Sequence, residues 1–189
     1  MIPLHTERLT IRNWEDRDRD LFHMINSDER VMEFYPFRRT RQEADEWFDI
    51  WRREIADTGI GGFAIELRAR GECIGYCGLK HPRVEPFLPS ETVEIGWRLA
   101  PRYWGNGYVT EAAERSIGYG FESIGLPEIV SFAVATNRRS TAVMDRLGMR
   151  RDEAGDFDHP RVPDTHKHLK RHALYRLSAG DWRERKKAI

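Results

Sequence analysis

Hydrophobic residues recur along the chain with two periods, one typical of strands and the other of helices. Alternating or continuous apolar runs predict strands near residues 8–12, 62–68, 73–81, 93–99 and 129–136. The pair 62–68 and 73–81, joined by Arg70-Gly71, has the pattern of a hairpin. Two further strands are predicted near 149–156 and 171–177, and a loop over 82–89.

Helical spacing of apolar residues predicts helices over 15–28, 40–56 and 110–121. A shorter helix should begin near Asn137 or Ser140, either of which can serve as its N-cap, and end at Leu147-Gly148. Core packing explains the regularly spaced apolar residues of the second helix better than a ligand cage does; these are Trp47, Phe48, Trp51 and Ile55. The pattern as a whole predicts an α/β fold.

Composition favours one domain over residues 1–189. The chain has 40% hydrophobic and 11% aromatic residues, enough for one substantial core. Its 31 basic and 31 acidic residues leave no net charge, so no nucleic-acid partner is expected, and the arginines of 37–41 and 183–187 fit solvated helix ends. Without an apolar run of roughly 20 residues or a signal peptide, no membrane association and a cytoplasmic location are expected.

Cysteines and histidines give no sign of a metal site. Cys73 and Cys77 lie about 13 Å apart along one predicted strand, too far to form a disulfide. The histidines at 159, 166, 168 and 172 fall in a connection rich in proline and charge, without a second ligand pair. No metal is expected.

The most informative segment is 102–110, Arg-Tyr-Trp-Gly-Asn-Gly-Tyr-Val-Thr, between a predicted strand and a predicted helix. The first turn of a helix has unpartnered N–H groups, and glycines let a phosphate approach the backbone, so a diphosphate is the expected ligand. A dinucleotide fingerprint would need glycine at Thr110, and no Walker lysine follows the glycines. An ordinary glycine-rich helix start is the remaining alternative.

Two sequence blocks resemble the GNAT acetyltransferase superfamily. Arg102-x-x-Gly105-x-Gly107 resembles its acyl-CoA diphosphate loop, and Asn137-x-x-Ser140-x-x-x-Met144-x-x-Leu147-Gly148-Met149 resembles a second conserved block. The segments 6–12, 28–36 and 172–177 resemble the branch that contains ribosomal-protein N-terminal acetyltransferases. The resemblance covers about residues 6–182 and is strongest over 93–149.

The resemblance implies a GNAT-like domain, with a mixed, mostly antiparallel twisted sheet of about 6–7 strands and about four helices. It implies acetyl-CoA as co-substrate, with the Asn137 amide contacting the pantetheine arm. The residues implied to bind the cofactor are Trp97, Arg98, Leu99, Arg102, Tyr103, Trp104, Gly105, Asn106, Gly107, Tyr108, Val109, Thr110, Asn137 and Ser140.

Acetyl transfer to an amine requires a group that accepts a proton, because amines with pKa values of about 8 to 10 are mostly charged at neutral pH. Glu94 resembles the strand glutamate that is the base in several GNAT enzymes; an ion pair with Arg98 or another cation is the structural alternative. Backbone N–H groups of 97–99 are implied to stabilise the thioester oxygen.

Protonation of the leaving thiolate needs a different residue from the usual one. The position of the tyrosine acid of many GNAT enzymes is Met144 here, so Ser140 is the candidate acid, with a helix N-cap as its alternative. Phe34, Tyr35, Phe37 and Phe157 are candidates for lining the acceptor cleft, although core packing explains them as well.

The sequence therefore predicts an acetyl-CoA-dependent N-acetyltransferase that acts on a primary amine, either a protein N-terminus or a small molecule. A non-catalytic acyl-CoA-binding sensor is the alternative. The oligomeric state, monomer or homodimer, stays open.

Overall fold

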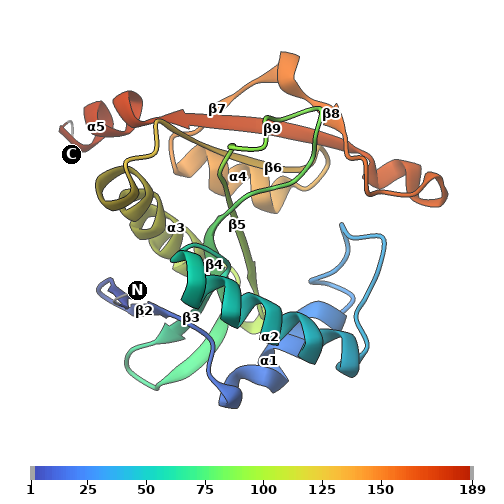
Figure 1. The fold of residues 1–189 in the computed structure, drawn as a ribbon, viewed down its shortest axis with the longest axis vertical. Helices are drawn as coiled ribbons and strands as arrows, with labels where there is room; N and C mark the ends of the chain where they lie inside the picture. Colours follow the sequence, from blue (N-terminus) through green and yellow to red (C-terminus); the bar gives the residue numbers. More distant parts are fainter. Residues whose placement is uncertain (1–2, 188–189) are drawn as a thin grey trace. The chain divides into compact units, whose positions relative to one another are not determined.

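The computed structural model describes residues 3–187 (Figure 1). The chain forms two compact units. The first unit contains residues 1–80 and 96–116, and the second contains 81–95 and 117–189.

The strands of the first unit follow one another along the chain. β1 (Leu4–His5), β2 (Leu9–Arg12), β3 (Phe63–Leu67) and β4 (Glu72–Lys80) pair antiparallel in that order. The next neighbour of β4 is β5 (Glu94–Leu99), of which residues 96–99 belong to this unit. A Cβ at Gly75 would lie 2.2 Å from the carbonyl oxygen of Arg98, so only glycine permits this approach of β4 to β5.

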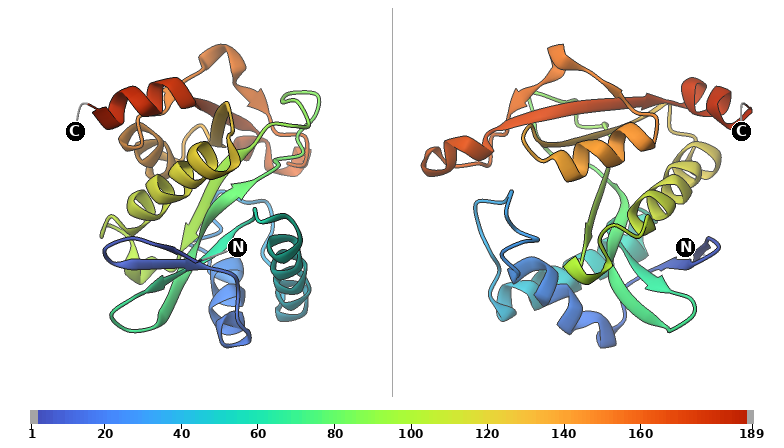
Figure 2. Two further views of the ribbon diagram at one scale, coloured as in Figure 1. Left: turned by 60° about the vertical axis from the view of Figure 1, so that its left-hand side comes forward. Right: turned by 180° about the vertical axis from the view of Figure 1, so that it is seen from behind.

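Two helices complete the first unit, α1 (Arg19–Ser27) and α2 (Arg41–Thr58), which lie side by side in Figures 1 and 2. A capping box of Thr40 and Glu43 begins α2, and left-handed Gly59 ends it. Phe48 and Ile55 are buried as predicted, whereas Trp47 is 39% exposed, so the prediction that Trp47 is a core residue is wrong.

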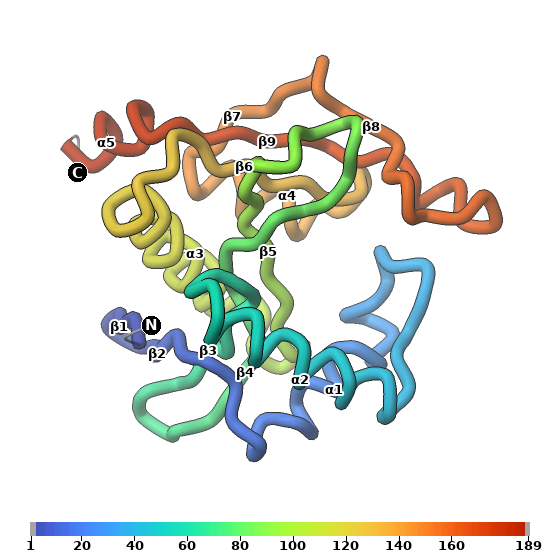
Figure 3. The backbone as a smooth tube through the Cα atoms, in the orientation of Figure 1, coloured from blue at the N-terminus to red at the C-terminus, as the bar shows by residue number. Residues whose placement is uncertain are grey.

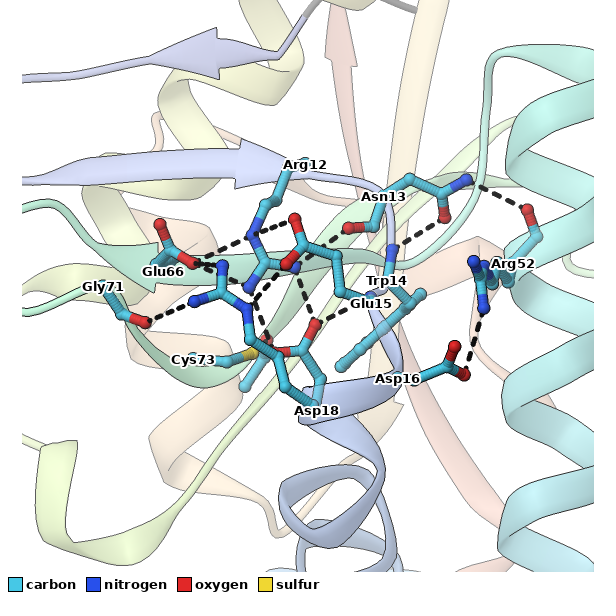
Figure 4. Close-up of polar contacts among 12 residues, drawn as sticks. Arg12, Asn13, Trp14, Glu15, Asp16, Asp18, Arg52, Glu66, Gly71 and Cys73 are labelled. Atoms are coloured by element: carbon cyan, nitrogen blue, oxygen red, sulfur yellow. Dashed lines mark hydrogen bonds and ion pairs between the residues drawn. The ribbon is translucent and has the colours of Figure 1, made fainter.

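A buried ion network fixes the start of the first unit (Figure 4). The guanidinium of Arg12 donates two hydrogen bonds to Asp18, at 2.7 and 3.0 Å, and two to Glu66, at 3.0 and 2.7 Å. Burial alone would lower the pKa of Arg12, but the hydrogen bonds to Asp18 and Glu66 outweigh burial and raise it. Arg12 and Asp18 are 8% and 3% exposed, so each charge depends on the other.

In the second unit, the first residues of β5 pair parallel with β6 (Glu128–Val134), which pairs antiparallel with β9 (Arg171–Ser178). The two-residue strands β7 (Arg150–Arg151) and β8 (Phe157–Asp158) also pair with β9. The connection 81–92 and α4 (Arg138–Arg146) lie on opposite faces of the β6–β9 pair (Figures 1 and 2).

Two further helices belong wholly or partly to the second unit. α3 (Tyr108–Tyr119) begins in the first unit and continues as a π-helical turn, Gly120–Ile124, in the second. α5 (Ala179–Lys187) follows β9 and was not predicted. Among residues 3–187, no helix is long and apolar enough to cross a membrane.

The predicted fold class is confirmed as α/β with a mixed, mostly antiparallel sheet. The described strands number nine rather than six or seven, because β1, β7 and β8 have only two residues each and leave little periodic signal. The strand predicted over 149–156 is confirmed only at β7, whose place beside β9 Figure 3 shows. After β7, Asp152 caps a 3₁₀ helix, Glu153–Gly155, by accepting from the Gly155 N–H. The predicted single domain over residues 1–189 stays a prediction.

Candidate cofactor and acceptor site

The glycine loop of the first unit has the backbone shape that a diphosphate site needs. Gly105 and Gly107 have φ values of +78° and +77°, a region that L side chains rarely adopt. A Cβ at Gly105 would meet no atom within 4 Å, and one at Gly107 would meet Arg8 Nη2 at 3.5 Å. The first hydrogen bond into α3 joins the Glu111 N–H to the Gly107 carbonyl at 3.1 Å, so the amides before Glu111 precede the helical ladder. Open space beside these amides fits a diphosphate.

Hydrogen bonds within the segment hold the loop in this shape. The indole N–H of Trp104 donates to the carbonyl of Leu99 at 2.9 Å, which ties the loop to the end of β5. The side-chain amide of Asn106 donates to the carbonyls of Tyr103 and Trp104 at 3.2 and 3.0 Å. Two predicted cofactor residues, Trp104 and Asn106, therefore shape the loop through their side chains.

Arg8 and Thr6 brace the loop from the N-terminal segment, a role that the sequence did not reveal. Arg8 donates to the Asn106 carbonyl at 3.0 Å and forms an ion pair with Glu111 at 2.6 Å. The Thr6 hydroxyl and the Arg8 backbone N–H also donate to Glu111. The segment 6–12 was noted only as a resemblance, and these contacts give its first residues a structural role in the same unit as the loop.

Arg102 and Tyr103 lie at the start of the loop, in a 3₁₀ helix over Pro101–Tyr103. The Arg102 guanidinium is exposed, lies 4.9 Å from the centre of the Tyr103 ring, and pairs with Glu72 of β4 at 2.9 Å. The neighbouring predicted cofactor residues Tyr108, Val109 and Thr110 form the first turn of α3 and are partly buried.

Asn137, not Ser140, is the N-cap of α4. The Asn137 side-chain oxygen accepts a hydrogen bond from the Ser140 backbone N–H at 3.2 Å. Within residues 3–187 the Ser140 hydroxyl has no hydrogen-bond partner, so the alternative that Ser140 is the helix cap is wrong. Met144 is 1% exposed, so the position at which the family resemblance implied a tyrosine holds a buried thioether.

Glu94 and His172 are two buried titratable residues of the second unit, and the charge of Glu94 acts on His172. Both are buried, at 7% and 8% exposed. Burial lowers the pKa of His172, while the hydrogen bond to Lys170 and the Glu94 carboxylate act in the opposite direction. The contact of His172 Nδ1 with the Lys170 carbonyl, at 2.8 Å, assigns the proton to Nδ1, because a carbonyl only accepts. In the neutral ring Nε2 is then the acceptor atom.

The strand predicted near 171–177 is confirmed as β9, and in it His172 lies opposite Val134 of β6 and Phe157 of β8. Around it, the rings of Phe157 and His159 lie with their centroids 5.8 and 4.8 Å away. Phe157 is only 3% exposed and packs with Val84, Leu88, Val130 and Leu174, which favours its core-packing interpretation. No group of three or more potential ligands able to hold a metal ion occurs among the residues that the structure describes.

The other predicted acceptor residues lie between α1 and α2 in the first unit. Tyr35 and Phe37 are 39% and 47% exposed, with ring centroids 6.2 Å apart, and Phe34 is partly buried. Arg98 of β5 lies over the Tyr35 ring at 4.3 Å and donates to Asn26 at 2.6 Å. Its strand neighbours differ in burial, since Trp97 is partly buried and Leu99 is buried.

Comparison with known proteins identifies the family of this chain. Residues 8–150 match the family model described as an acetyltransferase (GNAT) domain. The chain is 32% identical over 148 residues to the uncharacterized protein YkkB of Bacillus subtilis, covering 77% of this chain and 84% of that protein. It is also 32% identical over 152 residues to the FsC-acetyl coenzyme A-N(2)-transacetylase of Aspergillus fumigatus, covering 77% of this chain and 64% of that protein.

A solved structure of a GNAT-family acetyltransferase from Bacillus anthracis superposes with a TM-score of 0.78 at 26% identity, covering 95% of this chain and 99% of that one. Three findings indicate the same family. They are the glycine loop at the start of α3, the family match over residues 8–150, and the similarity to these relatives. The chain belongs to the GNAT acetyltransferase family.

Proposed function

We propose that this protein transfers an acetyl group from acetyl-CoA directly to a primary amine. The observation that carries this proposal is the loop at Gly105 and Gly107, whose left-handed glycines leave open space at the start of α3. Braced by Arg8 and by Trp104, the loop presents backbone N–H groups to a diphosphate without having to rearrange first. Acetyl-CoA supplies a reactive thioester when bound.

Glu94 and His172 are the groups suited to remove a proton from the amine. Glu94 is buried, and its charge acts on His172, whose pKa is lowered by burial in favour of the neutral ring. A carboxylate and a neutral imidazole that interact in this way can share a proton taken from the amine. In this proposal Glu94 is the base and His172 is its partner.

Direct transfer is favoured over an acyl-enzyme intermediate on cysteine. Burial raises the pKa of both Cys73 and Cys77 to about 12, so both are thiols at neutral pH. A thiol, unlike a thiolate, is a poor nucleophile. In this mechanism the backbone amides of 97–99 stabilise the thioester oxygen. The Ser140 hydroxyl donates its proton to the leaving sulfur and takes one from solvent in the same step.

The acceptor is an amine carried by a small molecule or by a protein N-terminus. The Aspergillus fumigatus relative is named for transfer between acetyl coenzyme A and an N(2) position, which supports a nitrogen atom as the acceptor. The exposed rings of Tyr35 and Phe37 offer such a molecule an apolar surface.

Release of free thiol from acetyl-CoA, measured against a panel of amines and short peptides, tests the proposal. We expect amine-dependent thiol release and a matching acetylated product by mass spectrometry. Acetyl-CoA at about 100 times its dissociation constant should also stabilise the protein by roughly 2.7 kcal/mol. Stabilisation without turnover of any amine would instead indicate a non-catalytic acyl-CoA sensor.

A further inference from the structure

Two arginines of the first unit, Arg39 and Arg98, lie near each other, since both contact Asn26. Most arginines of this unit form ion pairs with carboxylates; these are Arg8, Arg12, Arg17, Arg19, Arg30, Arg38, Arg41, Arg52 and Arg102. Within residues 3–187, neither Arg39 nor Arg98 forms an ion pair. Two cations in one place without carboxylate partners suggest that an anion comes from elsewhere.

Arg98 lies in neutral surroundings. Its guanidinium is over the ring of Tyr35, at 4.3 Å, and 5.6 Å from the ring of Tyr76. It donates to the side-chain oxygen of Asn26 at 2.6 Å, and Asn26 is itself 5% exposed and held by its bond to the Phe22 carbonyl. The Nε of Arg98 is buried and has no hydrogen-bond partner among the described residues. Buried donors are nearly always paired, so this donor calls for an acceptor.

Arg39 shares Asn26 with Arg98, because its backbone N–H donates to the Asn26 carbonyl at 2.9 Å. Its guanidinium lies over two exposed rings, 5.1 Å from Phe37 and 4.4 Å from Trp47. Burial lowers the pKa of Arg39, and the charge of Arg98 lowers it further, so the two cations repel each other. An anion between them would relieve this repulsion.

The acidic group that acts on Arg39 is Glu43, and its carboxylate already has partners. Glu43 accepts from the Thr40 backbone N–H at 2.8 Å and from the Thr40 hydroxyl at 3.1 Å, in the capping box of α2. Because the capping box holds the Glu43 carboxylate at the start of the helix, Glu43 forms no ion pair with Arg39. The charge of Arg39 can therefore act on a ligand.

We propose that an arginine cage, made of Asn26, Tyr35, Phe37, Arg39, Trp47 and Arg98, binds a carboxylate carried by the amine acceptor. The proposal rests on the proposed function and names its substrate class, an acidic amine such as an amino acid. Guanidinium groups match carboxylates in geometry and charge, and the exposed rings suit an apolar portion beside the carboxylate. A polycationic amine would be repelled by the same two arginines.

Calorimetry with product-like probes tests the cage without relying on turnover. N-acetyl amino acids and their carboxamides, such as N-acetylphenylalanine and its amide, differ only in the carboxylate and are titrated into the protein with CoA present. We expect the acids to bind about 10- to 100-fold more tightly than the amides, as for a charge-assisted hydrogen bond. Equal binding, or binding of neither class, would overturn the cage.

The variants are Arg39→Gln and Arg98→Lys, with Arg38→Gln as the matched control. Arg38 is exposed and pairs with Glu29 at 2.7 Å, so its replacement removes the same charge one residue away. Arg39→Gln should abolish the preference for acids, whereas Arg38→Gln should preserve it. If both variants lost the preference for acids equally, the preference would come from the net charge of the surface, and the proposal would be wrong. Unchanged CoA affinity checks the fold of Arg39→Gln and Arg38→Gln, and the circular dichroism spectrum checks that of Arg98→Lys. Arg39→Gln decides the test where Arg98→Lys does not fold.

Turnover assays separate the cage from the proposed function and identify the source of the carboxylate. Acid-selective binding without acetylation of any amine would contradict the function and leave the cage standing. Acetylation of amines without any preference for acids would contradict the cage alone. Faster transfer from succinyl-CoA than from acetyl-CoA, lost in Arg39→Gln, would place the carboxylate on the acyl group and overturn its assignment to the acceptor.

Discussion

The side-chain oxygen of Asn137 accepts a hydrogen bond from the Ser140 backbone N–H at 3.2 Å, so the cap of α4 is Asn137 and the Ser140 hydroxyl is not needed for it. The two residues therefore have separable roles. Asn137 holds the helix start, and its amide N–H groups remain available as donors. The Ser140 hydroxyl has no part in the cap.

Ser140→Ala should lower turnover and leave stability nearly unchanged. Without a capping role, its free energy of unfolding should stay within about 0.5 kcal/mol of the wild type, whereas Asn137→Ala should lose about 1 kcal/mol. As a general acid Ser140 should contribute roughly 10- to 100-fold to turnover at pH 7, with less effect above about pH 8.5, where thiols ionise unaided. Normal turnover of Ser140→Ala at pH 7 would remove it from the mechanism.

Gly107→Val should weaken CoA binding by at least roughly tenfold, or about 1.4 kcal/mol, because the branched side chain occupies the space of the diphosphate. Gly125→Val is the matched control: its φ is +79°, close to the +77° of Gly107, and a Cβ there meets no atom within 4 Å. Both variants should lose stability through backbone strain. Calorimetry that finds the same CoA affinity in both would refute the loop as the cofactor site.

Glu94→Gln keeps the shape of the side chain but cannot accept a proton, so turnover should fall by about 100- to 10,000-fold with little change in acetyl-CoA affinity. The control is Glu91→Gln, an exposed carboxylate three residues earlier. If Glu94→Gln is less stable yet turns over normally across roughly pH 6 to 9, Glu94 is structural and the base is another group or water.

His172 should make the protein less stable in mild acid. Its pKa is lowered in the folded state by burial, so the folded protein binds fewer protons than the unfolded chain below the unfolded pKa of about 6.5. This stability is fully present above that pH and is lost as pH falls through the folded pKa. Urea unfolding at pH 7.5 and pH 5.5 should show a smaller loss in His172→Gln than in the wild type. The same loss of stability in both proteins would show that His172 is not the source of the acid sensitivity.

The control for that measurement is His168→Gln, because His168 is exposed. Its pH dependence should match that of the wild type. In addition, Glu94→Gln should lower the pKa of His172 further, because the Glu94 carboxylate favours the charged ring. NMR titration of the histidine ring protons measures this shift directly.

Arg12→Met should destabilise the protein by about 3 to 5 kcal/mol, because the Asp18 carboxylate would stay buried without its partner. Arg17→Met tests the exposed side of the same network. Arg17 is 54% exposed and pairs with Glu15 and Glu66, so its loss should cost less than about 1 kcal/mol. Similar losses of stability in the two variants would show that the burial of Arg12 does not make its ion pairs more important than those of Arg17.

The sequence by itself determined the local features of this protein. Apolar periodicity located most longer elements of the chain, because period and capping residues act within a few turns of backbone. The loop 102–110 was equally local, since two glycines between a strand and a helix fix both the turn and the amides of the helix start. Its spacing was enough to indicate the family.

Tertiary structure decided the features that depend on contacts distant in sequence. Arg8 reaches Asn106 and Glu111 across about a hundred residues, and Arg98 meets Asn26 over 72, so no local pattern could have paired them. The same reason explains an error: Trp47 follows the helical period yet lies against Arg39 at the surface. Periodicity states which side of an element is apolar, and only the packing of that element against distant segments decides which charges are buried and which are left to bind a ligand.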